Sequence, residues 1–195
     1  MSSTTIEKIK NVSFKFFLEK GYEASNIREI CKVVQIKPAS LYFHYESKKA
    51  LFFNIYDEIW NEKLTMLAEI RKQRINETPD QLWFFLYRGS LEFCMKDISK
   101  NKFLMRYHLF PPEELMSEIT KSYREWTEKE NSYYLEAINK CMEMGILKKD
   151  RHPKDHLRAF KVFESFNIYE MILSNIRKTD TEIKEAWEEF LSKLM

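Results

Sequence analysis

The sequence has 195 residues, of which 44% are hydrophobic, so it is long enough for one large or two small domains with a buried core. Three glycines and five prolines are too few for the turns of a β-rich fold, so the composition predicts an all-α protein. The net charge is only +2, and no segment approaches the roughly 20 consecutive apolar residues of a membrane span. Residues 1–10 also lack the apolar region of a secretion signal, so we expect a cytoplasmic protein without a membrane partner.

The first two helices are marked by local capping signals. Thr4 and Glu7 have capping-box spacing ahead of a helical apolar pattern, and Gly21 follows that pattern where a left-handed residue is favoured. Asn26 and Glu29 repeat the capping-box spacing and open a second, short helix. The segment "QIKP" that comes next predicts a turn.

The third predicted helix, from Pro38 to Tyr45, is unusual. Proline is well tolerated in the first turn of a helix, but Lys37 is a poor residue for the capping position before it. Only Leu41 looks like an ordinary core residue, and the aromatic run "YFHY" follows it at once. We expect this helix to depend on its neighbours for stability and to present most of its side chains to a partner.

Six further helices are predicted, so that the chain would contain about nine helices in all. They are a long helix capped by Ser47 and ended by "NETPD", a helix from Pro79 ended by "ISKN", a brief helix over "KFLMRYHLF", a long helix from about Pro112 to Met144, a helix from about Pro153 to Arg177, and a last helix capped by Thr179 or Thr181.

The two short helices near residues 26–34 and 38–45 have the proportions of a helix-turn-helix, whose second helix lies in the DNA major groove. Leu41 and Tyr45 are one turn apart and can anchor this second helix. Residues 1–50 hold nine Lys or Arg and five Asp or Glu, whereas the remainder holds 23 basic and 25 acidic residues. A basic head on a slightly acidic body is typical of a module that binds a polyanion.

The motifs "F..KGYEAS.IREI" and "I...SLY.HY.SK.AL", which begin at Phe17 and Ile36, resemble the DNA-binding domain of the TetR family of bacterial transcriptional regulators. The resemblance implies a helix-turn-helix domain over residues 1–47 and a ligand-binding and dimerisation domain over residues 48–195. It also implies a homodimeric repressor, without enzymatic activity or a cofactor, that binds double-stranded operator DNA. Such a repressor leaves its operator when a small molecule binds.

Carried onto this sequence, the resemblance implies two sets of DNA-binding residues. Phosphate contacts are expected from Ser40, Tyr42, His44 and Lys48. Base edges are expected to meet Arg28, Lys37, Pro38, Ala39 and Phe43.

The chain departs from the family pattern at four places. Val34-Gln35 replaces a small residue followed by glycine, Lys37 replaces a Ser or Thr cap, Pro38-Ala39 replaces a basic residue followed by glycine, and Phe43 replaces a polar residue. We expect Gln35 to take up a strained backbone conformation at a cost of about 1 kcal/mol. Phe43 and Ala39 favour apolar contact with thymine methyl groups.

The body is rich in aromatic and methionine side chains, which fill an ordinary helical core or line a cavity for an apolar or aromatic effector. The predicted effector-binding residues are Tyr87, Met105, Tyr107, His108, Trp126, Tyr133, Phe166 and Asn167. Gly89, inside a helix, marks either close helix packing or room for the effector.

The last two helices carry apolar stripes that, by the same resemblance, form the homodimer. The predicted interface residues are Phe160, Phe163, Ile172, Trp187, Phe190 and Leu191. Two copies would place two reading helices about one turn of DNA apart, so a palindromic operator is expected.

Other classes of function find little support in the sequence. His152, Asp155 and His156 have a spacing that suits a metal on a helix, but Pro153 interrupts it, so we interpret the segment as a solvated connector. Cysteines at positions 31, 94 and 141 are odd in number and far apart, which predicts reduced thiols. A helical-bundle enzyme and an adaptor with a basic head are the alternatives, and steep salt dependence of DNA binding separates a regulator from an adaptor.

Overall fold

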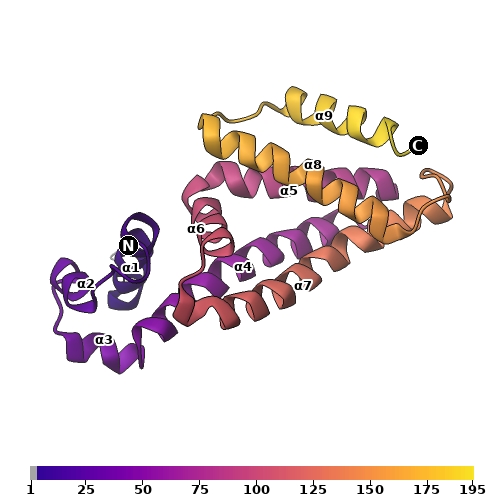
Figure 1. Cartoon of the computed structure of the whole chain (residues 1–195). Helices are drawn as coiled ribbons and strands as arrows, with labels where there is room; N and C mark the ends of the chain where they lie inside the picture. Colours follow the sequence, from indigo (N-terminus) through magenta and orange to yellow (C-terminus); the bar gives the residue numbers. More distant parts are fainter. Residues whose placement is uncertain (1–3) are drawn as a thin grey trace. The chain divides into compact units, whose positions relative to one another are not determined.

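The computed structural model describes residues 4–195, and within that range it is built from nine α-helices and one 3-10 turn, without strands (Figure 1). The all-α prediction is confirmed. The helices are α1 (Thr5–Lys20), α2 (Ile27–Val34), α3 (Pro38–His44), α4 (Lys48–Gln73), α5 (Pro79–Lys96), α6 (Ile98–Leu109), α7 (Met116–Glu143), α8 (Pro153–Ser174) and α9 (Asp180–Ser192), with the 3-10 turn η1 at Glu113–Leu115.

The packing divides the chain into two compact units. The head unit comprises the chain up to Asn61 together with Ser99–Tyr123, and the body unit comprises Glu62–Ile98 and Arg124–Met195. Helices α4 and α7 each contribute one part to the head unit and another to the body unit. None of the helices in residues 4–195 is both long and apolar enough to cross a lipid bilayer.

Several helix ends follow the predicted caps. The amide of Thr4 donates to the Glu7 carboxylate (2.8 Å), and the Glu7 amide donates to the Thr4 hydroxyl (3.2 Å), which completes a capping box. The Asn26 side chain caps α2 by accepting from the amide of Arg28 (2.8 Å). Of the two residues proposed to cap the last helix, Thr179 is the cap.

Three predicted boundaries are wrong by a few residues. The long helix expected from about Pro112 begins at Met116, because residues 113–115 form the 3-10 turn η1. The segment "ISKN" was expected to separate two helices, yet it forms the first turn of α6, because Asp97 alone interrupts the helical backbone (φ −150°, ψ 90°). Helix α8 ends at Ser174 instead of Arg177, because Asn175 adopts the left-handed conformation (φ 54°) that terminates a helix.

The head unit has a core of aromatic rings from several helices. Phe52 of α4 lies 5.6 Å from Phe17 and 4.7 Å from Tyr107, measured between ring centroids. The Tyr107 hydroxyl donates to the carbonyl of Phe17 (2.8 Å), a bond between residues 90 positions apart. This core supports the three short helices of the head.

The body unit has its own core, in which α5 is central. Trp83 and Tyr87 are fully buried and pack against Phe160 of α8 and Trp187 of α9. Gly89 also belongs here: a Cβ atom at this position would lie 2.3 Å from Cδ1 of Ile70. Gly89 therefore marks close packing of α5 against α4.

Gln35 provides the first testable prediction. It has φ 64° and ψ 42°, the left-handed conformation in which a Cβ atom is unfavourable. Because the side chain is exposed, Gln35→Gly should raise the free energy of unfolding by about 1 kcal/mol relative to Gln35→Ala. Chemical denaturation of both variants measures the difference. Equal stabilities would show that the bend carries no backbone strain.

Candidate nucleic-acid interface

The turn between α2 and α3 fixes the direction of α3. The amides of Gln35 and Ile36 donate to the carbonyls of Lys32 (3.3 Å) and Cys31 (3.0 Å), which closes α2 around the left-handed residue. Lys37 makes no side-chain capping bond, and Pro38 begins α3, as the sequence predicted. The start of α3 is therefore held by the turn and by packing instead of a cap.

One residue anchors α3 from within, and a second supports its end. Leu41 is fully buried in the head unit. Tyr45, which follows α3, is partly buried and its hydroxyl lies 3.4 Å from Oδ1 of Asn54 on α4. Burial raises the pKa of the Tyr45 hydroxyl above its ordinary value.

The remaining side chains of α3 face solvent. Tyr42 is 50% exposed and Phe43 is 85% exposed, values that are unusual for aromatic residues on a short helix. The other predicted DNA-contacting residues that are exposed are Arg28, Lys37, Pro38, Ala39, Ser40 and His44. An exposed aromatic surface on a helix anchored by one leucine is suited to contact with a partner.

Lys48, also predicted to bind DNA, is partly buried. Its Nζ lies 3.0 Å from the carbonyl of Tyr22 and 3.4 Å from that of Ser25, and 4.2 Å from the centre of the Tyr22 ring. An ammonium group has three donors, so two carbonyls leave one for an anion. The ammonium borders a surface depression that Arg28 and Tyr42 also line.

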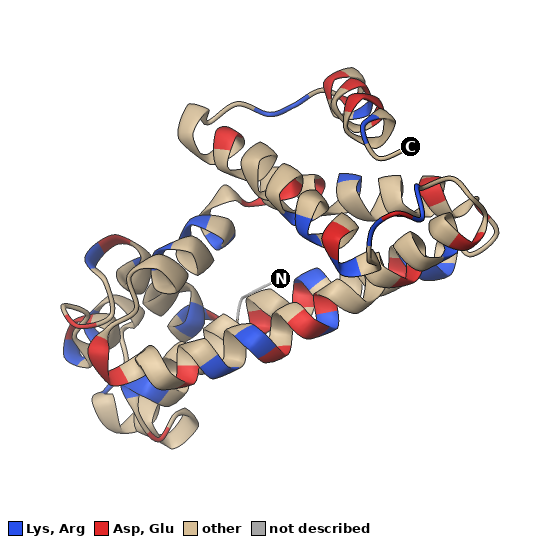
Figure 2. Ribbon diagram, turned by 45° about the vertical axis from the view of Figure 1, so that its right-hand side comes forward, with Lys and Arg blue, Asp and Glu red and all other residues tan. Residues whose placement is uncertain are grey.

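Helix α4 begins directly after α3. The Ser47 hydroxyl accepts from the amide of Ala50 (3.0 Å), which confirms Ser47 as the cap. The first turn of α4 contains no acidic residue and includes Lys48 and Lys49. Both signs of charge alternate along the long helices (Figure 2), and the Lys49 ammonium pairs with the carboxylate of Glu118, so Lys48 is the positive group of this turn that can attract an anion. It favours an anion near the α4 terminus.

The predicted effector-binding residues are divided between the two units. Met105, Tyr107 and His108 belong to the head unit, whereas Tyr87, Trp126, Tyr133, Phe166 and Asn167 belong to the body unit. Three of them already make internal bonds: Tyr107 to Phe17, His108 Nε2 to the Tyr56 hydroxyl (2.8 Å), and Asn167 Nδ2 to the carbonyl of Phe163 (2.8 Å). Phe166 is exposed on α8. Their joint role in effector binding stays a prediction.

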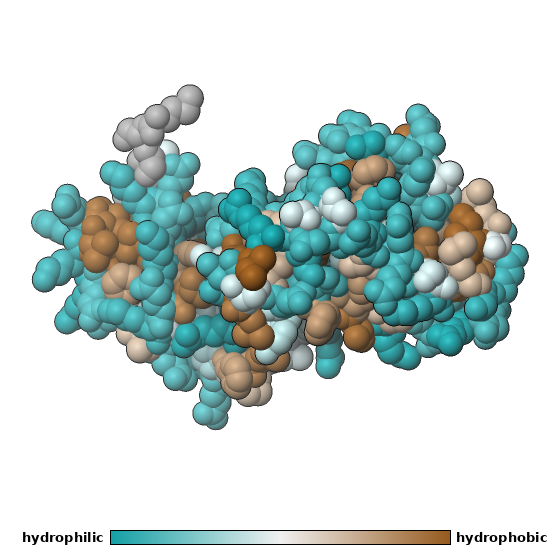
Figure 3. Space-filling view, turned by 90° about the horizontal axis from the view of Figure 1, so that it is seen from above, coloured by the Kyte–Doolittle hydropathy of each residue, from teal (hydrophilic) through white to brown (hydrophobic). Residues whose placement is uncertain are grey.

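The predicted dimer residues lie mainly in the body core. Phe160 and Trp187 are buried there, and the partly buried residues Phe163, Ile172, Phe190 and Leu191 pack against this core. The exposed apolar residues of this region form a different stripe, along α8 and just beyond it: Val162, Phe166, Tyr169, Leu173 and Ile176. Figure 3, seen from above, shows exposed hydrophobic residues (brown) between hydrophilic residues (teal) on one face of the molecule.

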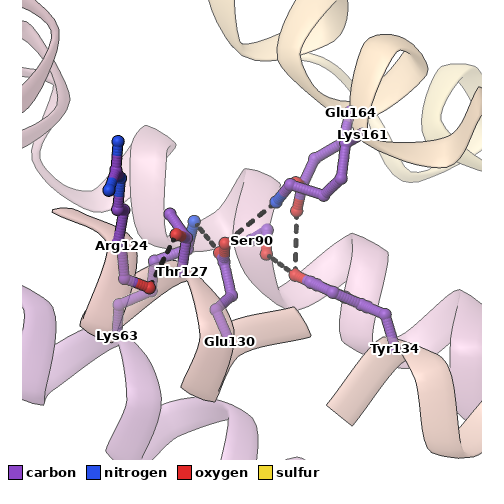
Figure 4. Close-up of polar contacts among 8 residues, drawn as sticks. All are labelled: Lys63, Ser90, Arg124, Thr127, Glu130, Tyr134, Lys161 and Glu164. Carbon is purple, nitrogen blue, oxygen red and sulfur yellow. Dashed lines mark hydrogen bonds and ion pairs between the residues drawn. The ribbon is translucent and has the colours of Figure 1, made fainter. Parts of the chain in front are cut away.

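A cluster of buried charges in the body unit has no counterpart in the sequence predictions (Figure 4). Lys63 of α4, Glu130 of α7, and Lys161 and Glu164 of α8 are linked by ion pairs. Burial by itself raises the pKa of the Glu130 carboxyl, but the ammonium groups of Lys63 and Lys161 outweigh burial and lower it to about 2. Glu130 is therefore a carboxylate at neutral pH although it is buried.

Two histidines at the start of α8, His152 and His156, make internal hydrogen bonds. Nδ1 of His152 accepts from the amide of Lys154 (3.2 Å) and caps α8, while His156 is buried with Nε2 3.2 Å from the carbonyl of Lys148. Among residues 4–195 no group of three or more His, Cys, Asp or Glu side chains is arranged to hold a metal ion. The three cysteines are buried and free of disulfides, and burial raises the pKa of Cys94 to about 11.

Comparison with known proteins places the chain among bacterial regulators. The model for the family "bacterial regulatory proteins, tetR family" matches residues 9–55. IcaR of Staphylococcus epidermidis, an HTH-type negative transcriptional regulator of the biofilm operon icaADBC, is 30% identical over 143 residues, which cover 73% of this chain and 67% of IcaR. IcaR of Staphylococcus aureus strain Newman is 32% identical over 114 residues, and the match spans 58% of each protein.

Solved structures share the fold at low identity. A regulatory protein of the tetR family from Rhodococcus RHA1 superposes with a TM-score of 0.74 at 15% identity, covering 99% of this chain and 98% of that one. The ketosteroid transcriptional regulator KstR2 of Mycobacterium tuberculosis gives a TM-score of 0.72 at 15% identity, covering 100% and 97%. These likenesses show the fold alone.

Three N-terminal helices, α1 to α3, of which α3 is short and exposed, followed by further helices, are the architecture of a helix-turn-helix transcriptional regulator. The chain belongs to the TetR family of bacterial transcriptional regulators. Regulators of this family bind operator DNA and act as dimers, and the relatives named above are regulators, not enzymes.

Proposed function

We propose that the protein is a cytoplasmic, homodimeric repressor that binds a palindromic operator through two copies of α3 and is released by a small apolar or aromatic effector. The observation that carries this proposal is the exposure of Tyr42 and Phe43 on a helix anchored by the buried Leu41. The relatives in Staphylococcus are named negative transcriptional regulators, which supports repression over activation.

Within this proposal the residues of the head have two roles. Ser40, Tyr42, His44 and Lys48 hold phosphates and set the position of α3 on the duplex. Arg28, Lys37, Pro38, Ala39 and Phe43 lie at the base edges. Apolar contact from Ala39 and Phe43 with thymine methyl groups then contributes part of the sequence preference.

The exposed stripe of α8 supplies the dimer contact in this proposal. Five apolar residues, Val162, Phe166, Tyr169, Leu173 and Ile176, are each at least 46% exposed in the single chain. A second copy would remove this area from water. The buried residues Phe160 and Trp187 then hold α8 and α9 in place from beneath.

In this proposal, the effector releases the repressor from its operator through α4, a single helix that belongs to both units. The helix is capped by Ser47 at the end of the head's third helix and continues into the body unit. An effector bound by residues 48–195 would shift α4, and residues 1–47 of the two copies would lose their register on DNA. Effector and operator must then weaken each other's binding by the same factor.

The roles of the head residues are tested by substitution. Binding of purified variants is measured against duplexes that the wild-type protein selects from a random-sequence library. Tyr42→Ala and Lys48→Ala should weaken binding to all duplexes by about tenfold, while Arg28→Ala should change the preferred sequence. Lys72→Ala, an exposed lysine of α4 in the body unit, is the control. Unchanged binding by all three head variants would refute the placement of α3 on DNA.

A further inference from the structure

Six side chains form one continuous polar chain through the body unit (Figure 4). Lys63 Nζ lies 2.5 Å from Glu130 Oε1, and Lys161 Nζ lies 2.9 Å from Glu130 Oε2. Lys161 also pairs with Glu164. The chain ends in two hydroxyl groups: that of Tyr134 donates to Glu164 Oε1 (2.9 Å) and lies 2.7 Å from the hydroxyl of Ser90.

The cluster is buried and balanced. Glu130 and Glu164 are at most 2% exposed and Lys63 is 8% exposed, whereas the Lys161 side chain is 28% exposed. Two positive charges face two negative charges. Removing ions from water costs free energy that can exceed their mutual attraction, so apolar residues of similar volume often give equal or greater stability. Stability alone therefore does not explain four charges in this core.

Such a cluster can instead fix the positions of the helices that carry its side chains. The hydrophobic effect is non-directional, whereas each hydrogen-bonded ion pair has one favourable geometry. The chain joins four helices: α4 through Lys63, α7 through Glu130 and Tyr134, α8 through Lys161 and Glu164, and α5 through Ser90. Glu130 is the central member, because its two oxygens hold α4 on one side and α8 on the other.

We propose that Lys63 and Glu130 are positioning residues for DNA binding, which fix α4 against α7 and α8 in the DNA-binding state although neither residue lies in the head unit. This inference rests on the proposed function, because α4 carries the capped start that follows α3. The Lys63–Glu130 pair links α4 to the cluster, and Arg71 on the same helix pairs separately with Glu136 of α7. Breaking the Lys63–Glu130 pair therefore loosens α4 at Lys63 while Lys161 and Glu164 stay paired.

The double variant Lys63→Met/Glu130→Met tests the inference, because it removes one charge of each sign and leaves Lys161 and Glu164 balanced. Its unfolding midpoint should equal or exceed that of the wild type, since the lost pair is replaced by apolar packing. Its affinity for the selected duplex should nevertheless fall at least about tenfold, and amide hydrogen exchange in residues 62–73 should rise at least about tenfold. Lys63→Arg, which keeps the ion pair, should bind like the wild type.

A control variant and two contrary outcomes complete the test. Lys72→Met, an exposed lysine on the same helix, should change neither affinity nor exchange. Wild-type affinity and wild-type exchange in the double variant would overturn the inference, as would a loss of affinity that only accompanies a lower unfolding midpoint. If the wild type selects no duplex, the proposed function fails, and hydrogen exchange alone then decides whether the pair holds α4.

Discussion

Replacing both Phe166 and Leu173 with glutamate should convert the protein into a folded monomer whose affinity for the selected duplex is lower by at least about 100-fold. Both residues are more than 60% exposed in the single chain, so the substitutions disturb no internal packing. Two carboxylates in the middle of an apolar contact would be buried without partners when two copies meet. Linked binding modules gain about 10²–10⁴ in affinity over single ones, and the monomer forfeits that gain.

The matched control is Ser132→Glu/Asn139→Glu, which places two glutamates with the same seven-residue spacing on exposed positions of α7. Sedimentation velocity reports the oligomeric state, and circular dichroism reports folding. The control should remain a dimer with wild-type affinity. A Phe166→Glu/Leu173→Glu variant that remains dimeric would show that copies of the chain meet through another surface.

Ala39→Glu should abolish detectable binding to the selected duplex, with a loss of at least about 100-fold. Ala39 is exposed near the start of α3, so glutamate fits there without changing the head core. In the proposed complex its carboxylate would face bases and phosphates, and like charges at an interface cost several kcal/mol, where each 1.4 kcal/mol is a factor of ten.

The control for this prediction is Ala68→Glu, the same substitution at an exposed position of α4 in the body unit. It changes the net charge equally and should lower affinity by less than about twofold. If both variants lose affinity to the same degree, the effect comes from net charge and not from the location of Ala39. Thermal unfolding of both variants confirms that the head remains folded.

The helices of the head could be predicted because their signals are local. Thr4 and Asn26 cap the helices that follow them, Pro38 begins the next, and Gln35 takes the left-handed conformation expected of a family glycine. The exposure of Tyr42, Phe43 and His44 followed from the two predicted anchors, Leu41 and Tyr45, which lie one turn apart. Signals of this kind depend on residues within a few positions of one another, which a sequence displays directly.

The exposed face of α8 could not be predicted, because two apolar stripes share this helix. Phe160 and Phe163 mark one stripe, and Val162 and Phe166 mark the other. Periodicity shows that both are apolar but not which one meets the chain's own core. Only the positions of α5 and α9, which pack on the first stripe, leave the second exposed.

The buried charge cluster could not be predicted from the sequence either. Lys63 and Glu130 are 67 positions apart, and each lies in a segment where charged residues alternate with apolar ones. A charge in such a segment is ordinarily solvated. Lys161 and Glu164, three positions apart beside the apolar residues Phe160, Val162 and Phe163, were the available signal, since charges that are buried among apolar residues must find partners.

The central claim is that the exposed face of α3 lies against DNA in each of two copies. It is tested most directly by replacing Phe43 with the photoreactive residue p-benzoylphenylalanine and irradiating the protein with the selected duplex. We expect crosslinks to DNA at two sites related by two-fold symmetry and about one helical turn apart, and no crosslinks from the same residue at the exposed body position Ile75. Efficient duplex binding without any crosslink from position 43 would contradict the account.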